Sequence, residues 1–425
     1  MNSKNKRVNR RLSFWLVLII WILCAGLGFV LTSLWINPHV KVFFNKDYWS
    51  ALAGIEKSLR LVHHEYVDRN KSNFDNLKLL AINGMVEGLD RHSQFFDKTQ
   101  YKNFQDNTKR RYVGIGIMIR KNPQGVMVTR VFENSPASSS GLKIGDIITH
   151  VNGHLIRGQE LEEVSEQIKG VAATEVAIRL LTNSENSQQL LITRQEIKIS
   201  SVDGSKIDEN GTAYLRIVQF TETSGKEVNE CLQMFQEKGL KRLIIDLRDN
   251  SGGLLLAALE LVELFVPAEK LILSVKGSEP MNLRKFKSSK DGPFVDLPLA
   301  ILINEKSASA SEIVAGSLSK SKRALLVGEK SFGKGSVQTI FPLSDGCGMK
   351  LTTATYFFSD GSTADVTGLV PDHFIPCSEH NETKLSLQRN YEDFETEETF
   401  EERFGFSKIK DEQLQFAKRI IMSVQ

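Results

Sequence analysis

The chain has 425 residues, of which 41% are hydrophobic and 25% charged, so it is long enough for two to four domains and is neither fibrous nor wholly disordered. Its formal net charge is +3, and residues 1–11 contribute five basic side chains and no acidic one. The rest holds 49 Lys and Arg against 51 Asp and Glu, which excludes the basic surface of a nucleic-acid-binding protein. Four scattered cysteines and the absence of an HExxH motif indicate neither a disulfide framework nor a metal site.

An uncharged segment of 24 residues, 13–36, follows the basic tail at 1–12. A helix of this length crosses the roughly 30 Å hydrocarbon core of a bilayer. Basic residues before it favour a cytoplasmic amino terminus, so we expect a single-pass protein of the inner (cytoplasmic) membrane. Residues 37–425 would then lie in the periplasm or another extracytoplasmic space. A cleaved signal peptide is the alternative, although its apolar region would span only about 7–15 residues. Bulky residues before Cys24 disfavour a lipoprotein.

Residues 37–105 contain few glycines and place apolar residues near helical spacing, which predicts a helical segment that packs or dimerises. The stretch 106–196 changes to short apolar strands and glycine turns, with a helix beginning near Glu160. Residues 197–385 alternate continuous apolar strands with helices, which predicts an α/β sheet covered on both faces. The last segment, 386–425, is polar: residues 391–402 are acid-rich and expected to be solvated, and 411–422 predict an amphipathic helix.

The glycine turns of 106–196 resemble those of PDZ domains of the bacterial protease-associated type. The matching residues are Gly114-Ile115-Gly116-Ile117 and Gly141-Leu142-Lys143-Ile144-Gly145-Asp146. This resemblance implies that backbone N–H groups of Gly114, Ile115, Gly116 and Ile117 hold a terminal carboxylate while the adjacent strand pairs with an extended peptide. Leu161 and Val164 on the following helix are weaker candidates for contact with a peptide side chain. The alternative is a β-rich spacer that binds nothing.

Two turns that follow buried strands, and one loop, hold groups suited to acyl transfer. The turn at 307–311 carries three serines at a helix start, the turn at 250–253 offers close glycine N–H donors, and the loop at 333–335 supplies Lys334. Taken singly, such a serine is usually an N-cap and such a lysine is usually solvated. A serine nucleophile needs a base, and the chain has no GxSxG elbow and no histidine near these turns in sequence. A lysine can act as the base where burial lowers its pKa.

Together, Asp246–Gly253, Asn304–Ile313 and Gly333–Gln338, downstream of a PDZ-like unit, resemble the carboxy-terminal processing peptidases. Leu89–Ser93, Thr367–Asp372 and Asp411–Leu414 extend the resemblance over nearly the whole chain. It implies a mixed α+β multidomain protein whose α/β core is ClpP/crotonase-like. It also implies that Ser309 is the nucleophile, Lys334 the general base and Gln338 its orienting group. The oxyanion hole would combine the N–H of Ala310 with a glycine N–H, for which we favour Gly252 over Gly253, and Glu312 is expected to be a structural support.

Three positions depart from the family pattern, namely Arg91, Ser251 and Lys306, and none removes a reacting group. The function implied is a membrane-anchored serine endopeptidase that cleaves proteins near their carboxy termini and needs no metal or organic cofactor. Its PDZ domain would bind the substrate terminus, gate the active site, or both. Expected partners are proteins or peptides with apolar carboxy termini, an adaptor or activator protein, and a second copy in a homodimer.

Three other functions are weighed against the protease. The first is a catalytically inert PDZ adaptor or scaffold of the cell envelope. The second is an ATPase, since 328–335 nearly spells a P-loop, although Gly335 stands where Ser or Thr would bind magnesium. The third is a Ser-His-Asp hydrolase that uses His92 or His373. The pairing of Cys231, Cys347 and Cys377 is left open.

Overall fold

A computed structural model describes residues 42–425 except 110, 133, 182–187, 199, 279–282, 344, 392–396 and 424–425, and also Trp21 and Gly26. Apart from these last two residues, the predicted membrane segment at 13–36 lies outside the described residues. Within the described part of the chain, no helix is both long enough and apolar enough to cross a bilayer. The chain divides into two compact units between Leu89 and Asp90, and each unit is described by itself.

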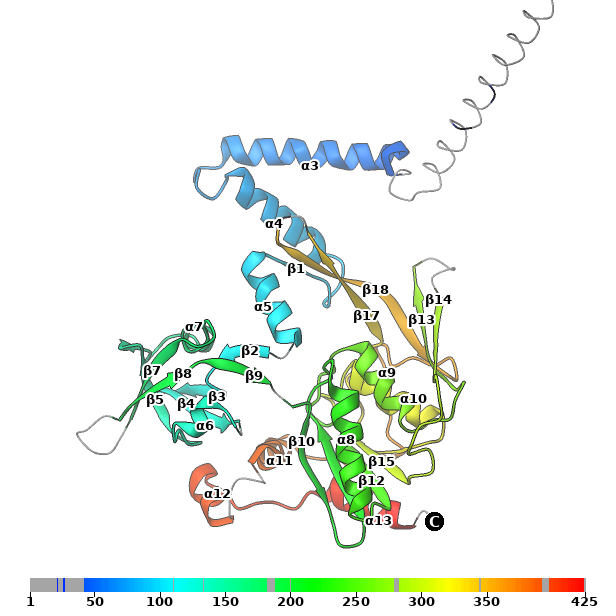
Figure 1. The fold of residues 1–425 in the computed structure, drawn as a ribbon. Helices are drawn as coiled ribbons and strands as arrows, with labels where there is room; N and C mark the ends of the chain where they lie inside the picture. The colour runs from blue at the N-terminus through cyan, green and yellow to red at the C-terminus, as the bar shows by residue number, and fades with distance from the viewer. Residues whose placement is uncertain are drawn as a thin grey trace, which may run out of the picture. The chain divides into compact units, whose positions relative to one another are not determined.

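The amino-terminal unit is a helical hairpin (Figure 1). A short turn, η1 (Val42–Phe44), precedes helices α3 (Lys46–Glu65) and α4 (Phe74–Glu87). Asn45 and Asn73 cap the two helices, because each side-chain oxygen accepts a backbone N–H of the first turn. The predicted helical character is confirmed here. Apolar side chains from both helices border a groove of about 590 Å³.

The second unit begins with a departure from the predicted helix. Asp90 accepts the N–H groups of His92 and Ser93, and this side-chain turn replaces helical hydrogen bonds. Strand β1 (Gln94–Phe96) follows and pairs antiparallel with β18 (Gly348–Phe358). Helix α5 (Lys98–Lys109) comes after it. The predicted helical segment up to residue 105 is therefore interrupted by a strand that belongs to the second unit.

A β-rich subdomain follows, as predicted. Its sheet has the order β3-β4-β5-β7-β8, with β6 beside β5, and β2 pairs separately with β9. The buried side chains form one core, and α7 lies beside β3. The bounds are β2 (Arg111–Gly114), β3 (Ile117–Asn122), β4 (Gly125–Val131), α6 (Pro136–Ser139), β5 (Ile147–Val151), β6 (His154–Leu155), α7 (Leu161–Ile168), β7 (Glu175–Leu180), β8 (Gln189–Thr193) and β9 (Gln195–Lys198).

A six-stranded sheet in the order β10-β11-β12-β15-β16-β19 forms the centre of the remaining chain. Only its first pair, β10 with β11, is antiparallel, and every other neighbouring pair is parallel. The strands are β10 (Val202–Ile207), β11 (Thr212–Ile217), β12 (Arg242–Asp246), β15 (Leu299–Ile303), β16 (Leu325–Gly328) and β19 (His373–Phe374). Parallel neighbours bring the carboxyl ends of β12, β15 and β16 to one edge of the sheet.

Both faces of this sheet are covered, which explains why its strands are continuous apolar runs. Leu243 and Ile245 belong to the core that includes helices α8 (Ser224–Glu237), α9 (Leu255–Glu263) and α10 (Ala310–Lys320). Ile244 points to the other face and packs with Ala417 and Ile421 of helix α13 (Glu412–Ser423). The predicted α/β sheet and the predicted terminal helix are confirmed.

A second sheet has the order β1-β18-β13-β14, with β17 also paired to β18. Its other strands are β13 (Leu271–Gly277), β14 (Leu283–Lys287) and β17 (Ser336–Pro342). The carboxy-terminal segment adds helices α11 (Glu379–Tyr391) and α12 (Glu397–Phe404). The expectation that 391–402 is simply solvated is wrong, because Phe400 in α12 is fully buried against Phe404 and Phe406.

Candidate active site

The structure distinguishes the three serines of the turn at 307–311. The hydroxyl of Ser307 donates to the carbonyl of Leu247 at 2.8 Å, and that of Ser311 donates to the carbonyl of Asn250 at 2.8 Å. Both side chains are completely buried. Ser309, in contrast, is partly exposed and lines a cavity of about 370 Å³. Two of the serines therefore hold the turn together, and the third faces the cavity.

Ser309 stands at a sharp strand-to-helix turn. Its backbone has φ 54° and ψ −113°, a region that residues with a Cβ rarely adopt, and it is the N-cap of α10. Ala310 is the first residue of this helix, so its N–H has no acceptor within the helix and points out at the positive end of the helix dipole. An oxyanion that forms beside Ser309 would meet this donor.

The carboxylate of Glu312 connects the serine turn to the lysine loop. One of its oxygens accepts the N–H of Ser309 at 2.8 Å and the N–H of Lys334 at 2.9 Å. The other oxygen accepts the hydroxyl of Ser331 at 2.6 Å and the N–H of Gly333 at 2.7 Å. Glu312 is completely buried, so these four donors replace water around its charge. The expectation that Glu312 is a structural support agrees with this geometry.

A glycine turn at the end of β12 lies against the serine turn. Gly252 has φ +103°, and a Cβ built there would stand 2.7 Å from the carbonyl oxygen of Ala308 and 2.9 Å from the N atom of Ala310. Its N–H donates to the side-chain oxygen of Asn250 at 2.8 Å, and Gly253 is the glycine that lines the cavity. The N–H group of Gly252, which the sequence analysis favours as an oxyanion donor, is therefore already hydrogen-bonded to Asn250.

Lys334 reaches the same cavity from the loop between β16 and β17. Burial lowers the pKa of Lys334 below the usual lysine value, and the nearby charges of Lys350 and Arg91 also lower it. The carboxylates of Glu312 and Asp90 act in the opposite direction without reversing the shift. The lowered pKa makes the neutral amine, which is the form that can accept a proton, easier to reach than in a free lysine.

Gln338 on β17 also lines the cavity. Its amide nitrogen donates to the hydroxyl of Ser336 at 2.9 Å and to that of Thr352 at 3.3 Å. Among the described hydrogen bonds, none joins Lys334 to Ser309 or to Gln338. The structure therefore brings all three predicted residues to one cavity. In free enzymes, catalytic hydrogen bonds often form only once the substrate is bound.

The predicted carboxylate loop at 114–117 belongs to the β-rich subdomain. Gly116 has φ +83°, and a Cβ there would clash with Ser135 at 2.3 Å, so this position requires glycine. The carbonyl groups of Ile115 and Gly116 accept the N–H groups of Ala137 and Phe132, which holds the loop. Val164 is completely buried in the subdomain core and so cannot line an open groove, contrary to expectation, whereas Leu161 is only partly buried.

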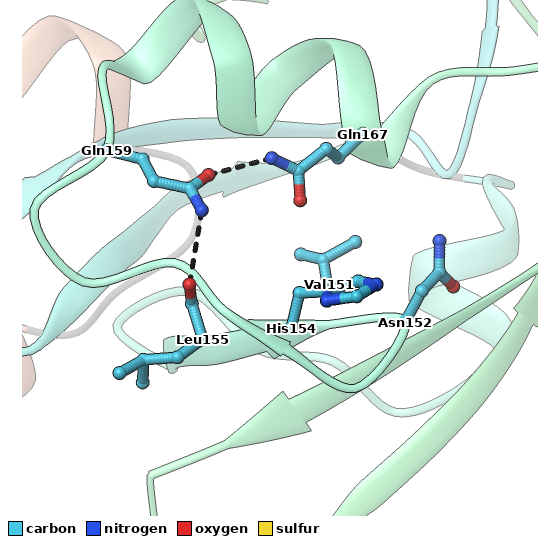
Figure 2. A pocket seen from close by; sticks show the side chains of 6 residues that line it. All are labelled: Val151, Asn152, His154, Leu155, Gln159 and Gln167. Atoms are coloured by element: carbon cyan, nitrogen blue, oxygen red, sulfur yellow. Dashed lines mark hydrogen bonds between the residues drawn. The ribbon is translucent and has the colours of Figure 1, made fainter.

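A separate polar hollow of about 490 Å³ lies between α7 and the turn that joins β5 to β6 (Figure 2). Gln167 donates to Gln159 at 2.7 Å, and Gln159 donates to the carbonyl of Leu155 at 3.1 Å. Val151, Asn152 and His154 complete its lining, and no residue of the loop at 114–117 contributes to it. This hollow is therefore distinct from the predicted peptide groove.

The local geometry argues against the two rival enzymes. The N–H groups of Gly333 and Lys334 bond the carboxylate of Glu312, and that of Gly335 bonds Asp365, so they cannot cradle a phosphate. The loop also leads into strand β17, whereas a P-loop leads into a helix. Neither His92 nor His373 lines the cavity that holds Ser309.

Sequence reasoning missed a buried charge cluster behind the site. Arg248 and Asp246 are both fully buried and lie 2.6 Å apart, and Arg248 also pairs with Asp411 at 2.8 Å. Although burial alone raises the pKa of Asp246, the charge and hydrogen bonds of Arg248 hold it well below its usual value. The alternation of acid and base at 246–248 was visible in the sequence, but the partner 163 residues away was not.

Comparisons with known proteins agree with this site. A model of peptidase family S41 matches residues 211–375, and a PDZ domain model matches residues 103–181. A "probable CtpA-like serine protease" of Staphylococcus aureus is 32% identical over 372 residues, which are 87% of this chain and 74% of the relative. The chain therefore belongs to the carboxy-terminal processing peptidases of family S41. A carboxy-terminal-processing protease of Bartonella bacilliformis is 35% identical over 305 residues, which are 70% of each chain.

Among solved structures, a photosystem II D1 C-terminal processing protease is similar to this peptidase, with a TM-score of 0.45 and 25% identity. The match covers 77% of this chain and 95% of that one. The two family models and the curated relatives show that the peptidase is a mixed α+β protein with a PDZ domain and a protease core. They also show that it is a serine-type endopeptidase that processes carboxy termini. The inert adaptor is not favoured. Cys231, Cys347 and Cys377 form no disulfide in the described part of the chain.

Proposed function

We propose that this peptidase cleaves its substrates with Ser309 as nucleophile and Lys334 as general base. Neutral Lys334 accepts the hydroxyl proton of Ser309, and the serine oxygen attacks a peptide carbonyl. Protonated Lys334 then gives its proton to the leaving amine, and water hydrolyses the acyl-enzyme. Gln338 orients the lysine. No metal or organic cofactor takes part in this sequence of steps.

The oxyanion hole of this proposal combines the N–H of Ala310 with that of a glycine. Because the N–H of Gly252 is bonded to Asn250 and Gly253 lines the cavity, we assign the second donor to Gly253. Gly252 retains a role in shape, since only a glycine lets the two turns approach so closely. A well-placed donor of this kind is worth about 2.7–4 kcal/mol of transition-state stabilisation.

The main support for the proposal is that the three serines of the turn have different environments. The hydroxyl groups of Ser307 and Ser311 donate buried hydrogen bonds to backbone carbonyls. Of the three serines, Ser309 alone lines a cavity together with Lys334. The positive φ of Ser309 adds support, because strained backbone conformations of this kind cluster at active sites.

Cleavage of an unfolded protein with an apolar carboxy-terminal tail tests this mechanism. Ser309→Ala and Lys334→Ala should each lower kcat/KM by at least about 10³-fold, with circular dichroism unchanged. A serine-reactive phosphonate should label the wild-type protein at residue 309 only. Activity retained by either variant would refute the assignment of that residue.

We further propose that the PDZ domain both recruits apolar carboxy termini and gates the cavity. Support comes from α7 beside β3, the arrangement that holds an extended peptide in such domains, and from the loop at 114–117. Deletion of residues 106–196 separates these roles. Higher basal cleavage would indicate a gate, lower cleavage would indicate recruitment, and unchanged rate and selectivity would eliminate both.

The predicted segment at 13–36 leads us to propose an inner-membrane anchor with the catalytic part outside the cytoplasm. Its support is the uncharged run of 24 residues behind a basic tail. The protein should remain with membranes after a carbonate wash and be digested by protease added to spheroplasts. Release by the wash, or protection from the protease, would contradict this topology. An adaptor or activator and a homodimer stay predictions.

A further inference from the structure

The catalytic cavity contains a second lysine that the proposed mechanism does not use. Lys350 on β18 lines the cavity together with Ser309 and Lys334. Tyr356 on the same strand also lines the cavity, beyond the register shift of the β17–β18 pair between Thr352 and Ala354. Tyr356 is six positions after Lys350, a separation of about 20 Å in an extended strand, so the cavity is long enough for an extended peptide of several residues.

The strand register places Lys350 close to Gln338 along the cavity. In the β17–β18 pair, Thr352 lies opposite Gln338, and Lys350 lies opposite Ile340. Two residues of a strand cover about 7 Å. Lys350 therefore lies about 7 Å from Gln338 along the strand direction. This distance corresponds to about two residues of an extended substrate.

The charge of Lys350 is not balanced by an anion in contact with it. Its ammonium group donates to the neutral side-chain oxygen of Gln94 at 3.3 Å and lies 5.5 Å from the centre of the Phe96 ring. Among the residues that the structure describes, no carboxylate forms an ion pair with it. Lys306, the other lysine near the serine turn, has Asp249 at 3.7 Å.

The carboxylate whose charge acts on Lys350, that of Asp90, is already hydrogen-bonded. Asp90 accepts the N–H groups of His92 and Ser93 and the hydroxyl groups of Ser93 and Thr352. Burial lowers the pKa of Lys350, because part of its hydration is lost and Asp90 compensates only in part. A partly desolvated cation that borders a substrate cavity is suited to binding an anionic group of the substrate.

We propose that Lys350 determines specificity by binding a carboxylate of the peptide in the catalytic cavity, about two residues from the scissile bond. This inference rests on the proposed function, since it places the substrate across Ser309. Lys334 must be neutral to act as the base, so Lys350 is the other lysine of the cavity lining that a carboxylate of the substrate could pair with. The group recognised is either an acidic side chain or the free carboxy terminus of a short tail.

Three matched peptides distinguish these sources. The first has a single Glu two residues from the cleavage site and an amidated terminus. The second has Gln there and an amidated terminus, and the third has Gln and a free terminal carboxylate at that distance. We expect kcat/KM of the full-length protein to be about 10-fold higher for the first or the third peptide than for the second.

Variants of Lys350 connect this preference to its charge. Lys350→Met should reduce the preference to about 1, Lys350→Arg should keep it, and Lys350→Glu should favour a peptide with Lys at that position. Each preference is a ratio for one enzyme, so an effect of the variant on Lys334 cancels. The control Lys330→Met removes an exposed lysine outside the cavity and should leave the ratio unchanged.

Failure of this inference differs from failure of the proposed function. If wild-type protein cleaves all three peptides equally, with Glu placed on either side of the cleavage site, Lys350 has no such role although Ser309 and Lys334 are unaffected. If Lys350→Met keeps the wild-type ratio, the preference arises elsewhere and the inference is also wrong. Cleavage by Ser309→Ala would instead refute the proposed mechanism itself.

Discussion

The two sides of the catalytic cavity are held by different kinds of interaction. On the serine side, buried hydroxyl and amide groups fix the backbone. Ser307 and Ser311 bond carbonyl groups of the neighbouring turn, and Asn250 bonds the carbonyl of Ile217 at the end of β11. On the lysine side, half-buried charged groups surround Lys334, among them Lys350 and Asp90. The comparison indicates that hydrogen bonds set the position of the nucleophile, whereas burial and, after it, nearby charges lower the pKa of the base.

Among substitutions that leave Ser309 and Lys334 in place, the largest effect should come from the close approach of the two turns on the serine side. Gly252→Ala places a Cβ within 3 Å of Ala308 and Ala310 at a positive φ, and so displaces the proposed oxyanion donors. We expect kcat/KM to fall by about 10²–10³-fold. Gly54→Ala is the control, since its Cβ meets nothing within 4 Å. Full activity of Gly252→Ala would contradict this prediction, because it would show that the turns at 250–253 and 307–311 need not lie so close together.

A smaller loss of activity is expected from a change in Glu312, whose carboxylate bonds both the serine side and the lysine side of the cavity. Glu312→Gln keeps the shape of the side chain but replaces one carboxylate oxygen with an NH₂ group. In the wild-type protein both oxygens accept N–H groups, so donors that bonded the lost oxygen would be left without an acceptor. An unsatisfied buried donor costs about 1–3 kcal/mol, so chemical denaturation should show a lower free energy of unfolding by about this amount. The rate of cleavage should fall about 10-fold or more. A variant as stable and active as wild type would show that Glu312 does not couple the two sides.

The structural serines allow a milder test of the serine side. Ser311→Ala removes the hydroxyl that bonds the carbonyl of Asn250, at a cost of about 1 kcal/mol in the free energy of unfolding. Labelling of residue 309 by the serine-reactive probe should persist. Loss of labelling in Ser311→Ala with Ser309 intact would mean that the nucleophile has been assigned to the wrong serine.

The smallest effect should appear on the lysine side, as a shift of the pH profile. Activity requires neutral Lys334, so kcat/KM should rise with pH through an apparent pKa below the usual lysine value of about 10.4. Lys350→Met removes a positive charge that lowers this pKa, so the rise should move to higher pH. Lys350→Arg should leave the profile in place. A profile that moves to lower pH in Lys350→Met would contradict the electrostatic account.

Local patterns predicted much of this architecture, because they depend on neighbours in the chain. The continuous apolar strands at 243–246 and 299–303 indicated a sheet buried on both faces, and both faces are covered. The helical reading of 37–105 failed at 94–96, where Asp90 makes a side-chain turn and Phe95 and Phe96 are buried. A three-residue strand that depends on a partner about 250 residues away leaves no local signal.

By itself, the sequence determined the order of the elements, the turns that carry reactive side chains and, through its motifs, the family. Only the tertiary structure decided which serine is exposed, that the N–H of Gly252 is occupied, and that Lys350 borders the same cavity as Lys334. The reason is that hydrogen-bond partners and electrostatic neighbours are set by distance in space. Residues 309, 334 and 350 lie in different segments of the chain, and only the pairing of β17 with β18 and the docking of α10 bring them together.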